Sequence, residues 1–146
     1  MKDGTFHVGN LILHPDMKEK DFMSDSQFEQ QKNKSTTVYL TREKQKVGNM
    51  LCWLKVIASN GKITNFELRN AAETQDNQCM RHGIKNSRIL LKRIRESHDS
   101  FLKERLGFPD EENHNGKEYF FSWGNIYSYM DPIAGTCGIL ISYAKK

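Results

Sequence analysis

The sequence lacks the features that mark membrane-spanning, secreted or metal-stabilised proteins. No run of residues approaches the roughly 18 consecutive apolar positions that a membrane-spanning helix requires. The N-terminus, which begins with residues 1–7, lacks the apolar segment expected of a secretory signal. The three cysteines, Cys52, Cys79 and Cys137, are far apart and odd in number, so they indicate neither a disulfide framework nor a zinc site. We therefore expect a cytoplasmic protein with reduced thiols, no cofactor and no metal.

The short motifs of common enzyme classes are missing as well. The sequence contains no phosphate-binding loop of the Walker type, no glycine-rich dinucleotide fingerprint, no paired-histidine zinc motif and no nucleophile elbow. Because these motifs are local and easily found, their absence favours a binding protein over an enzyme.

Length and charge are typical of one globular domain. A chain of 146 residues with 37% hydrophobic and 27% charged residues can bury a core without a disulfide or a metal. The formal net charge of +4 permits attraction to an acidic partner. It does not amount to the dense basic stripe of a dedicated nucleic-acid binder.

The N-terminal part is predicted to contain a strand, a short helix and a loop. Apolar residues alternate over residues 6–13, which predicts a strand. A short helix follows, with Met17, Phe22 and Met23 directed inward. Residues 27–35 are polar and are predicted to form a loop.

The next part is predicted to contain a second strand and a hairpin. Residues 36–41 are β-branched and aromatic, as in a strand. Residues 50–58 are apolar on both faces, which predicts a central strand covered on both sides. Asn60 and Gly61 favour a two-residue turn in which both positions need positive φ. Residues 62–68 alternate and would form the returning strand.

From residue 77 to residue 106 the hydrophobic period changes to about 3.6, which predicts one long helix. Gly107 and Pro109 would end it. The apolar stripe of this helix consists of Ile84, Leu91, Ile94, His98, Phe101 and Leu102. The basic residues outside the stripe include Arg81, Lys85, Arg88, Lys92, Arg93 and Arg95.

The C-terminal part is predicted to be β again. Residues 110–116 form a polar connector, residues 131–135 form a loop, and residues 137–143 form the last strand. A strand over residues 119–129 would carry aromatic rings on one side, namely Tyr119, Phe121, Trp123, Tyr127 and Tyr129. The element order predicts a single α+β domain over residues 1–146. In it, a mostly antiparallel sheet of about six strands packs on one long helix, with a short N-terminal helix.

Catalytic roles for histidine and cysteine are disfavoured. His98 is followed by Asp99, but adjacent helical side chains diverge by about 100° and do not pair with each other. The place of His98 on the apolar stripe favours a half-buried packing role. The cysteines lie in apolar or helical runs, where a free thiol is usually buried. A Cys or His hydrolase is therefore the least favoured function.

Two surfaces are candidates for binding a partner. The basic side of a helix is most often a solvated face, but it can also dock an acidic protein or phosphates. Tyrosines near the loop at residues 131–135 are candidates for exposure, and tyrosine is favoured at protein interfaces. We expect the partner-binding residues to be Arg88, Lys92, Arg95, Tyr127 and Tyr129.

The C-terminal third also carries an ordered set of short motifs. An aromatic strand leads to Ser-Trp-Gly at residues 122–124, then to Asp-Pro-x-x-Gly at residues 131–135, then to Ile-x-Ile-x-Tyr at residues 139–143. A His-Asp and Leu-Gly helix end at residues 98–107 precedes them. This set resembles small bacterial immunity proteins of contact-dependent growth inhibition and polymorphic toxin systems. The resemblance extends over about residues 95–143.

The resemblance implies a protein that binds a cognate toxin domain and neutralises it by steric occlusion, with no chemistry, small-molecule substrate or membrane of its own. Immunity proteins against nucleases are usually acidic, so the positive charge implies another kind of toxin or contact through the acidic residues 110–112. The alternative is a small nucleic-acid-associated protein that uses the basic helix face.

Overall fold

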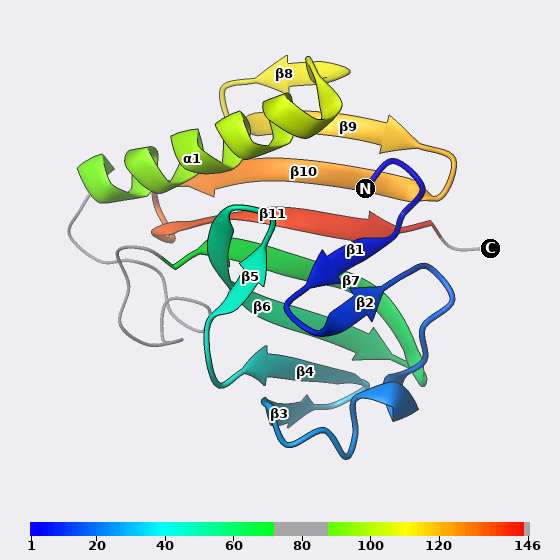
Figure 1. The fold of residues 1–146 in the computed structure, drawn as a ribbon. Helices are drawn as coiled ribbons and strands as arrows, with labels where there is room; N and C mark the ends of the chain where they lie inside the picture. The colour runs from blue at the N-terminus through cyan, green and yellow to red at the C-terminus, as the bar shows by residue number, and fades with distance from the viewer. Residues whose placement is uncertain (72–87, 145–146) are drawn as a thin grey trace.

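The computed structural model of the protein describes residues 1–71 and 88–144, and one antiparallel sheet dominates it (Figure 1). The strands before the helix are β1 (Phe6–Val8), β2 (Leu11–Leu13), β3 (Phe28–Asn33), β4 (Thr36–Thr41), β5 (Gln45–Val47), β6 (Met50–Ser59) and β7 (Lys62–Asn70). The strands after it are β8 (Glu111–Asn113), β9 (Gly116–Phe121), β10 (Gly124–Asp131) and β11 (Thr136–Tyr143). The described helices are the 3₁₀ helix η1 (Glu19–Asp21) and the α-helix α1 (Arg88–Leu106).

Nine of the eleven described strands form this sheet, in the order β3-β4-β6-β7-β11-β10-β9-β8, and β5 also pairs with β6. Strands β1 and β2 form a separate hairpin. The first and second halves of the sheet join where β11 pairs antiparallel with β7. Figure 1 shows α1 and the β1–β2 hairpin on the same face of the sheet.

The predicted hairpin between residues 50 and 68 is confirmed. Strands β6 and β7 pair antiparallel, and the two turn residues Asn60 and Gly61 have φ angles of 54° and 77°. Both are positive, as a two-residue turn that follows the twist of the strands requires. The second predicted strand, residues 36–41, is also confirmed as β4.

The expected architecture of about six strands on one long helix is wrong, because the sheet is much larger. Residues 27–35 and 110–116, predicted to be loops, contain the strands β3 and β8. These are the outermost strands of the sheet, and most of their residues are exposed. An edge strand of this kind has few positions to bury, so its sequence lacks the apolar alternation that signals a strand.

Two predicted single strands are in fact hairpins. Residues 6–13 divide into β1 and β2 at Gly9, whose φ is 58°, and residues 119–129 divide into parts of β9 and β10 after Phe121. The apolar alternation continues across both turns, so it does not reveal the reversal. The short N-terminal helix is only the three-residue η1, which leaves Phe22 buried but Met23 58% exposed.

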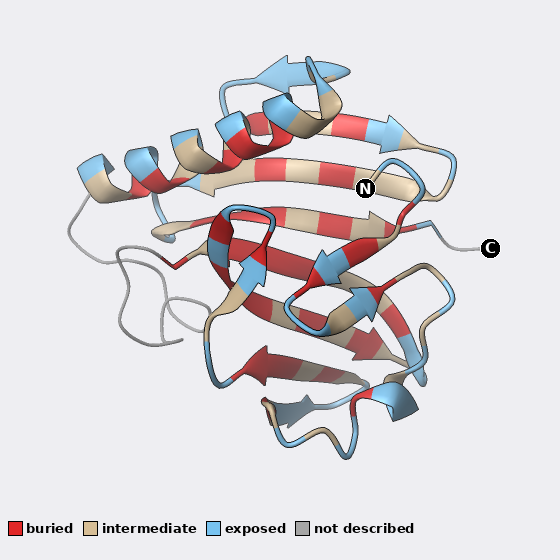
Figure 2. Ribbon diagram, viewed as in Figure 1, coloured by how far each residue is buried: buried red, intermediate tan, exposed pale blue. Residues whose placement is uncertain are grey.

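Helix α1 packs one side onto the sheet, as the apolar stripe predicted (Figure 2). The stripe residues Leu91, Ile94, His98, Phe101 and Leu102 are all buried, whereas Ile84 lies outside the described residues. The main core cluster joins Phe101 and Leu102 to the inner sides of the sheet and of the β1–β2 hairpin. The side chains of α1 therefore share one core with the N-terminal residues.

The central strand β6 is buried on one face, but the second face, predicted to be covered as well, is buried only at Trp53, while Leu51 is 43% exposed. Cys52, Leu54 and Val56 belong to the core beneath α1 and the β1–β2 hairpin. Trp53, which points to the other face, is only 3% exposed and packs with Leu40 in a second cluster. The second face of β6 is therefore covered only around Trp53, where Leu40 and Ala71 join it in this small cluster.

A glycine controls the turn between β9 and β10. Gly124 has a φ of 150°, and a Cβ added there would overlap the carbonyl oxygen of Ser142 on β11. Gly107, after the end of α1, has a φ of 82° but open space where a Cβ would lie. Both positions require a positive φ, but only Gly124 lacks the space for a Cβ.

We expect Gly124→Ala to lower the free energy of unfolding by about 3 kcal/mol, because both backbone strain and a steric overlap oppose the methyl group. Gly107→Ala should cost only about 1 kcal/mol, since strain acts alone. Urea denaturation of both variants measures the difference. Equal losses would show that β9, β10 and β11 are not packed as closely as described.

Candidate partner-binding surfaces

Exposed basic residues on the outer side of α1 gather near its first described turns, and a further one, Lys103, lies in its last turn. Arg88 and Lys92 are exposed, as the sequence predicted, while Arg81 and Lys85 lie outside the described residues. Further along the helix the exposed Glu96 interrupts the positive charge. The basic surface is therefore a short patch and not a stripe along the helix.

Exposed apolar side chains accompany these cations. Ile89 on α1 is 75% exposed, and Ile133 at the turn between β10 and β11 is 98% exposed. The turn is held by Asp131, whose side chain accepts the backbone N–H groups of Ile133 and Ala134 at 3.0 and 3.2 Å. A large apolar side chain is thus displayed on a structured turn.

The turn and the helix start belong to one region of the molecule. Leu90 on α1 and Met130 on β10 pack against the same small core cluster, which contains Cys137. Figure 1 shows the first described turns of α1 beside the ends of β10 and β11 that carry this turn. We call the exposed group formed by Arg88, Ile89, Lys92 and Ile133 the basic-apolar patch.

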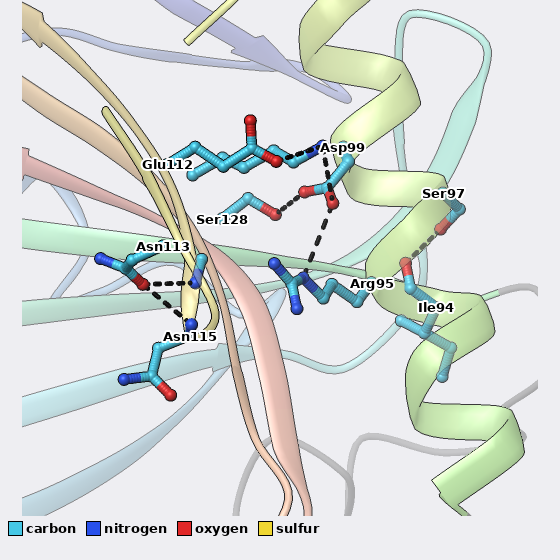
Figure 3. A network of polar contacts seen from close by, with 10 residues as sticks. Ile94, Arg95, Ser97, Asp99, Glu112, Asn113, Asn115 and Ser128 are labelled. Atoms are coloured by element: carbon cyan, nitrogen blue, oxygen red, sulfur yellow. Dashed lines mark hydrogen bonds and ion pairs between the residues drawn. The ribbon is translucent and has the colours of Figure 1, made fainter. Parts of the chain in front are cut away.

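Arg95, the third predicted basic anchor, is directed into the fold (Figure 3). Its side chain is 16% exposed, and its Nε lies 3.6 Å from Oδ2 of Asp99. Asp99 accepts a hydrogen bond of 2.6 Å from the hydroxyl of Ser128 on β10. Lys117 on β9 lies 3.6 Å from both Asp99 and Glu112, which extends the network to β8. The network attaches α1 to the C-terminal strands.

The predicted tyrosines lie on the opposite face of the sheet from α1. Ser128 on β10 bonds to the helix and Ile126 packs beneath it, so the alternating Tyr127 and Tyr129 point to the other side. Both tyrosines are half-buried. The five predicted anchors therefore do not form one continuous surface.

Tyr129 belongs to a buried polar network that the sequence did not reveal. Its hydroxyl donates a 2.5 Å hydrogen bond to Glu67, which is 6% exposed. The other carboxylate oxygen of Glu67 lies 3.4 Å from Arg69, which is 1% exposed. Arg69 also donates through Nε to the carbonyl of Cys137 at 2.5 Å. Burial and the neighbouring carboxylate of Glu67 raise the pKa of Tyr129, so its hydroxyl stays protonated and donates.

Two glycines make room for this network. A Cβ at Gly138 would lie 2.7 Å from the carboxyl carbon of Glu67, and a Cβ at Gly116 would lie 2.6 Å from the ring of Tyr127. The rings of Tyr127 and Tyr129 stack with centroids 6.0 Å apart. A glycine inside a strand can mark a close approach, so Gly138 was a signal that another group comes near β11, but it did not identify that group as Glu67.

His98 is fully buried rather than half-buried. Its Nε2 accepts the backbone N–H of Asn70 at 2.9 Å, which requires a neutral ring. Burial, with a smaller contribution from the charge of Arg69, lowers its pKa to about 3.

Burial raises the pKa of Cys52 to about 12, so this thiol is not an activated nucleophile. Cys79 lies outside the described residues.

Comparison of the chain with protein-family models, curated proteins and solved structures gave no match. Among residues 1–71 and 88–144, the side chains form no cluster of three or more metal-ligating residues. None of the helices described is long and apolar enough to cross a membrane.

Acid should destabilise the fold through His98. Its pKa is lower in the folded state than the ordinary value of 6.5, so the unfolded chain takes up a proton first as the pH falls. The neutral ring makes its full contribution to the free energy of unfolding above pH 6.5, and this contribution declines as the pH falls toward 3. In His98→Gln, whose amide oxygen can replace Nε2 as acceptor, the slope of unfolding free energy against pH should decrease by up to about 1.4 kcal/mol per pH unit.

Denaturation in urea between pH 4 and pH 7 measures this slope. His7→Gln, at an exposed position on β1, is the control and should keep the slope of the unmodified protein. An unchanged slope in His98→Gln would contradict the buried neutral state of His98.

Tyr129→Phe should lower the free energy of unfolding by about 1–3 kcal/mol, because Glu67 would lose a donor while remaining buried. Tyr127→Phe is the matched control: no hydrogen bond of the Tyr127 hydroxyl occurs among the described residues, so the change should stay within about 0.5 kcal/mol. Equal effects of the two substitutions would rule out the network around Glu67.

Proposed function

We propose that this chain is an immunity-type binding protein that neutralises a cognate bacterial toxin domain by occluding it. The resemblance of residues 95–143 to such immunity proteins supports the proposal. The contact would be a stoichiometric protein–protein complex, in which this chain contributes a shaped surface and no catalytic group.

The observation that carries the proposal is the basic-apolar patch. Ile89 and Ile133 are large apolar side chains with 75% and 98% exposure, and the cations Arg88 and Lys92 accompany them. Exposed apolar side chains accompanied by charged residues occur at surfaces that bind proteins. Solvation alone explains exposed arginine and lysine, but it gives no reason for isoleucine at these positions.

The patch specifies the chemistry of the partner. A complementary toxin surface would place an apolar centre against the isoleucines and carboxylates against Arg88 and Lys92. A stable complex buries roughly 1,200–2,000 Å² in total, so neighbouring residues must add to the interface. The four residues of the patch would be its anchors, because a few residues usually carry most of the binding energy.

The other predicted anchors are less suited to this role. Arg95 is largely buried beside Asp99, and the hydroxyl of Tyr129 is engaged by Glu67. Binding through Tyr127 and Tyr129 would also occur on the face of the sheet opposite α1. We therefore place the interface at the patch and treat the tyrosine face as the surface to compare with it.

Nucleic-acid binding is the weaker candidate. Glu96 interrupts the basic side of α1, and Glu104 near its end lies 3.7 Å from Arg105. A surface that follows the sugar-phosphate backbone of a nucleic acid needs several cations spaced to meet successive phosphates. Its affinity must fall steeply as the salt concentration rises. The patch offers fewer cations and adds two isoleucines.

The direct experiment has two steps: the genes beside that of this chain are searched for one encoding a large secreted protein with a variable C-terminal domain, and that domain is then titrated with the chain by calorimetry. Arg88→Glu combined with Lys92→Glu should weaken the complex at least about tenfold, because each substitution puts like charges at the contact. Ile133→Ser should weaken it by about tenfold with unchanged stability, since Ile133 is 98% exposed.

The control is Lys20→Glu combined with Lys32→Glu, which changes the charge equally at exposed positions on η1 and β3. It should leave the affinity within about threefold, a change of under 1 kcal/mol. No complex with the neighbouring domain would refute the immunity function. A complex insensitive to the patch variants but weakened by Tyr127→Ala would retain the function and move the interface to the tyrosine face.

A further inference from the structure

A cleft of about 630 Å³ lies far along α1 from the basic-apolar patch. Three separated segments form it: residues 1–7, the turn after β5 at Val47 and Gly48, and the last turns of α1. Its volume lies in the range of small-molecule sites, which is roughly 300–1,000 Å³. None of the interactions assigned above to partner binding uses this cleft.

The floor of the cleft is apolar, aromatic and fixed. Phe6, Val47 and Phe101 line it and are 2%, 4% and 5% exposed. The ring of Phe6 makes edge contacts with Phe66 at 5.1 Å and with Trp123 at 5.9 Å between centroids. A planar apolar group entering the cleft would therefore meet a preformed surface.

The rim of the cleft presents a positioned guanidinium group. The Arg105 guanidinium carbon lies 3.8 Å from the centre of the Phe101 ring, and its Nη1 and Nη2 donate to the Phe101 carbonyl at 3.2 Å and to Asn49 at 3.3 Å. A Cβ at Gly48 would overlap Nη2, so this glycine leaves the space that Arg105 occupies. The planar guanidinium has further N–H groups with which to bind an anion.

The N-terminal part of the lining is also held in place. The carbonyl of Lys2 accepts a 2.8 Å hydrogen bond from the indole N–H of Trp123, and the carbonyl of Gly4 accepts one of 3.1 Å from Tyr143. The exposed Lys2 and His7 line this side. These bonds fix the backbone at Lys2 and Gly4, and the Lys2 side chain adds a second cation to the lining.

The one acidic side chain of the lining is already engaged. Asp3 accepts the backbone N–H of Thr5 at 2.9 Å, and this bond is the main cause of its lowered pKa. Its carboxylate also lies 3.8 Å from the amino group of Met1. Arg105 also lies 3.7 Å from the exposed Glu104, but among the groups that line the cleft the cations Arg105, Lys2 and the Met1 amino group outnumber the single carboxylate of Asp3.

We propose that this cleft binds a small aromatic anion. The ring would contact the apolar lining, in which Met1 and Leu106 are partly exposed and Phe6, Val47 and Phe101 are buried. The acidic group would bind Arg105, and Lys2 would add electrostatic attraction. Sulfonate, carboxylate and phosphate share this chemistry, and the planar guanidinium can bind each of them with two parallel hydrogen bonds. Such a ligand would bridge the N-terminal segment and the end of α1.

The probes are naphthalene-2-sulfonate, the neutral naphthalene-2-methanol and inorganic sulfate, each titrated into the ¹⁵N-labelled full chain. The aromatic anion should shift the amide signals of residues 1–7, Val47, Gly48 and the end of α1. It should bind about tenfold more tightly than the neutral alcohol or than sulfate, because only it combines both interactions.

Arg105→Gln should reduce the affinity for naphthalene-2-sulfonate about tenfold, whereas Arg42→Gln, a substitution of an exposed arginine between β4 and β5, should not change it. Thr5→Phe, which fills the cleft, should abolish binding and provides a second test if Arg105→Gln proves unstable. Shifts outside the cleft, equal affinity for the neutral probe, or unchanged affinity in Arg105→Gln would each overturn the proposal. The outcome does not depend on whether a toxin domain binds elsewhere.

Discussion

The pairing of β7 with β11 is the constraint on which the rest of the structure depends. The other described pairings of the large sheet join strands close in the sequence, but this one joins its two halves. On one face, Phe66 opposite Ile141 and Leu68 opposite Ile139 bury the seam within the core. On the other face, Glu67 and Arg69 connect β7 to β10 and β11 through Tyr129 and the Cys137 carbonyl. A shift of one residue would exchange these apolar and polar sets.

This seam also explains why the candidate surfaces are separate. Helix α1 covers the apolar side of β10 and β11, and its outer side carries the cations of the patch. The polar side of the same strands carries Tyr127 and Tyr129. Residues that are neighbours in the sequence, such as Ser128 and Tyr129, thereby serve opposite faces. A binding surface built on α1 cannot be continuous with one built on the tyrosines.

The sequence allowed the parts with a strong local signal to be predicted. The turn at Asn60 and Gly61 and the stripe of α1 follow from φ requirements and from hydrophobic period. The edge strands β3 and β8 had no such signal, because polar residues suffice where few side chains are buried. The exposure of Arg88 and Lys92 could be predicted from the helix pattern. The burial of Arg95, and of Glu67 beside Arg69, could not, because it depends on contacts between distant segments.

The composition of the outermost strands determines where the sheet stops. A strand at the margin of a sheet has backbone groups to which another chain can add, and extended apolar margins promote aggregation. Here one margin is β3, whose last four residues are Gln, Gln, Lys and Asn, and the other is β8, three residues long with two glutamates. Charge, polarity and short length at these margins oppose strand addition by a second molecule. A sheet of nine strands is in this way confined within a single chain, and association is left to side-chain surfaces.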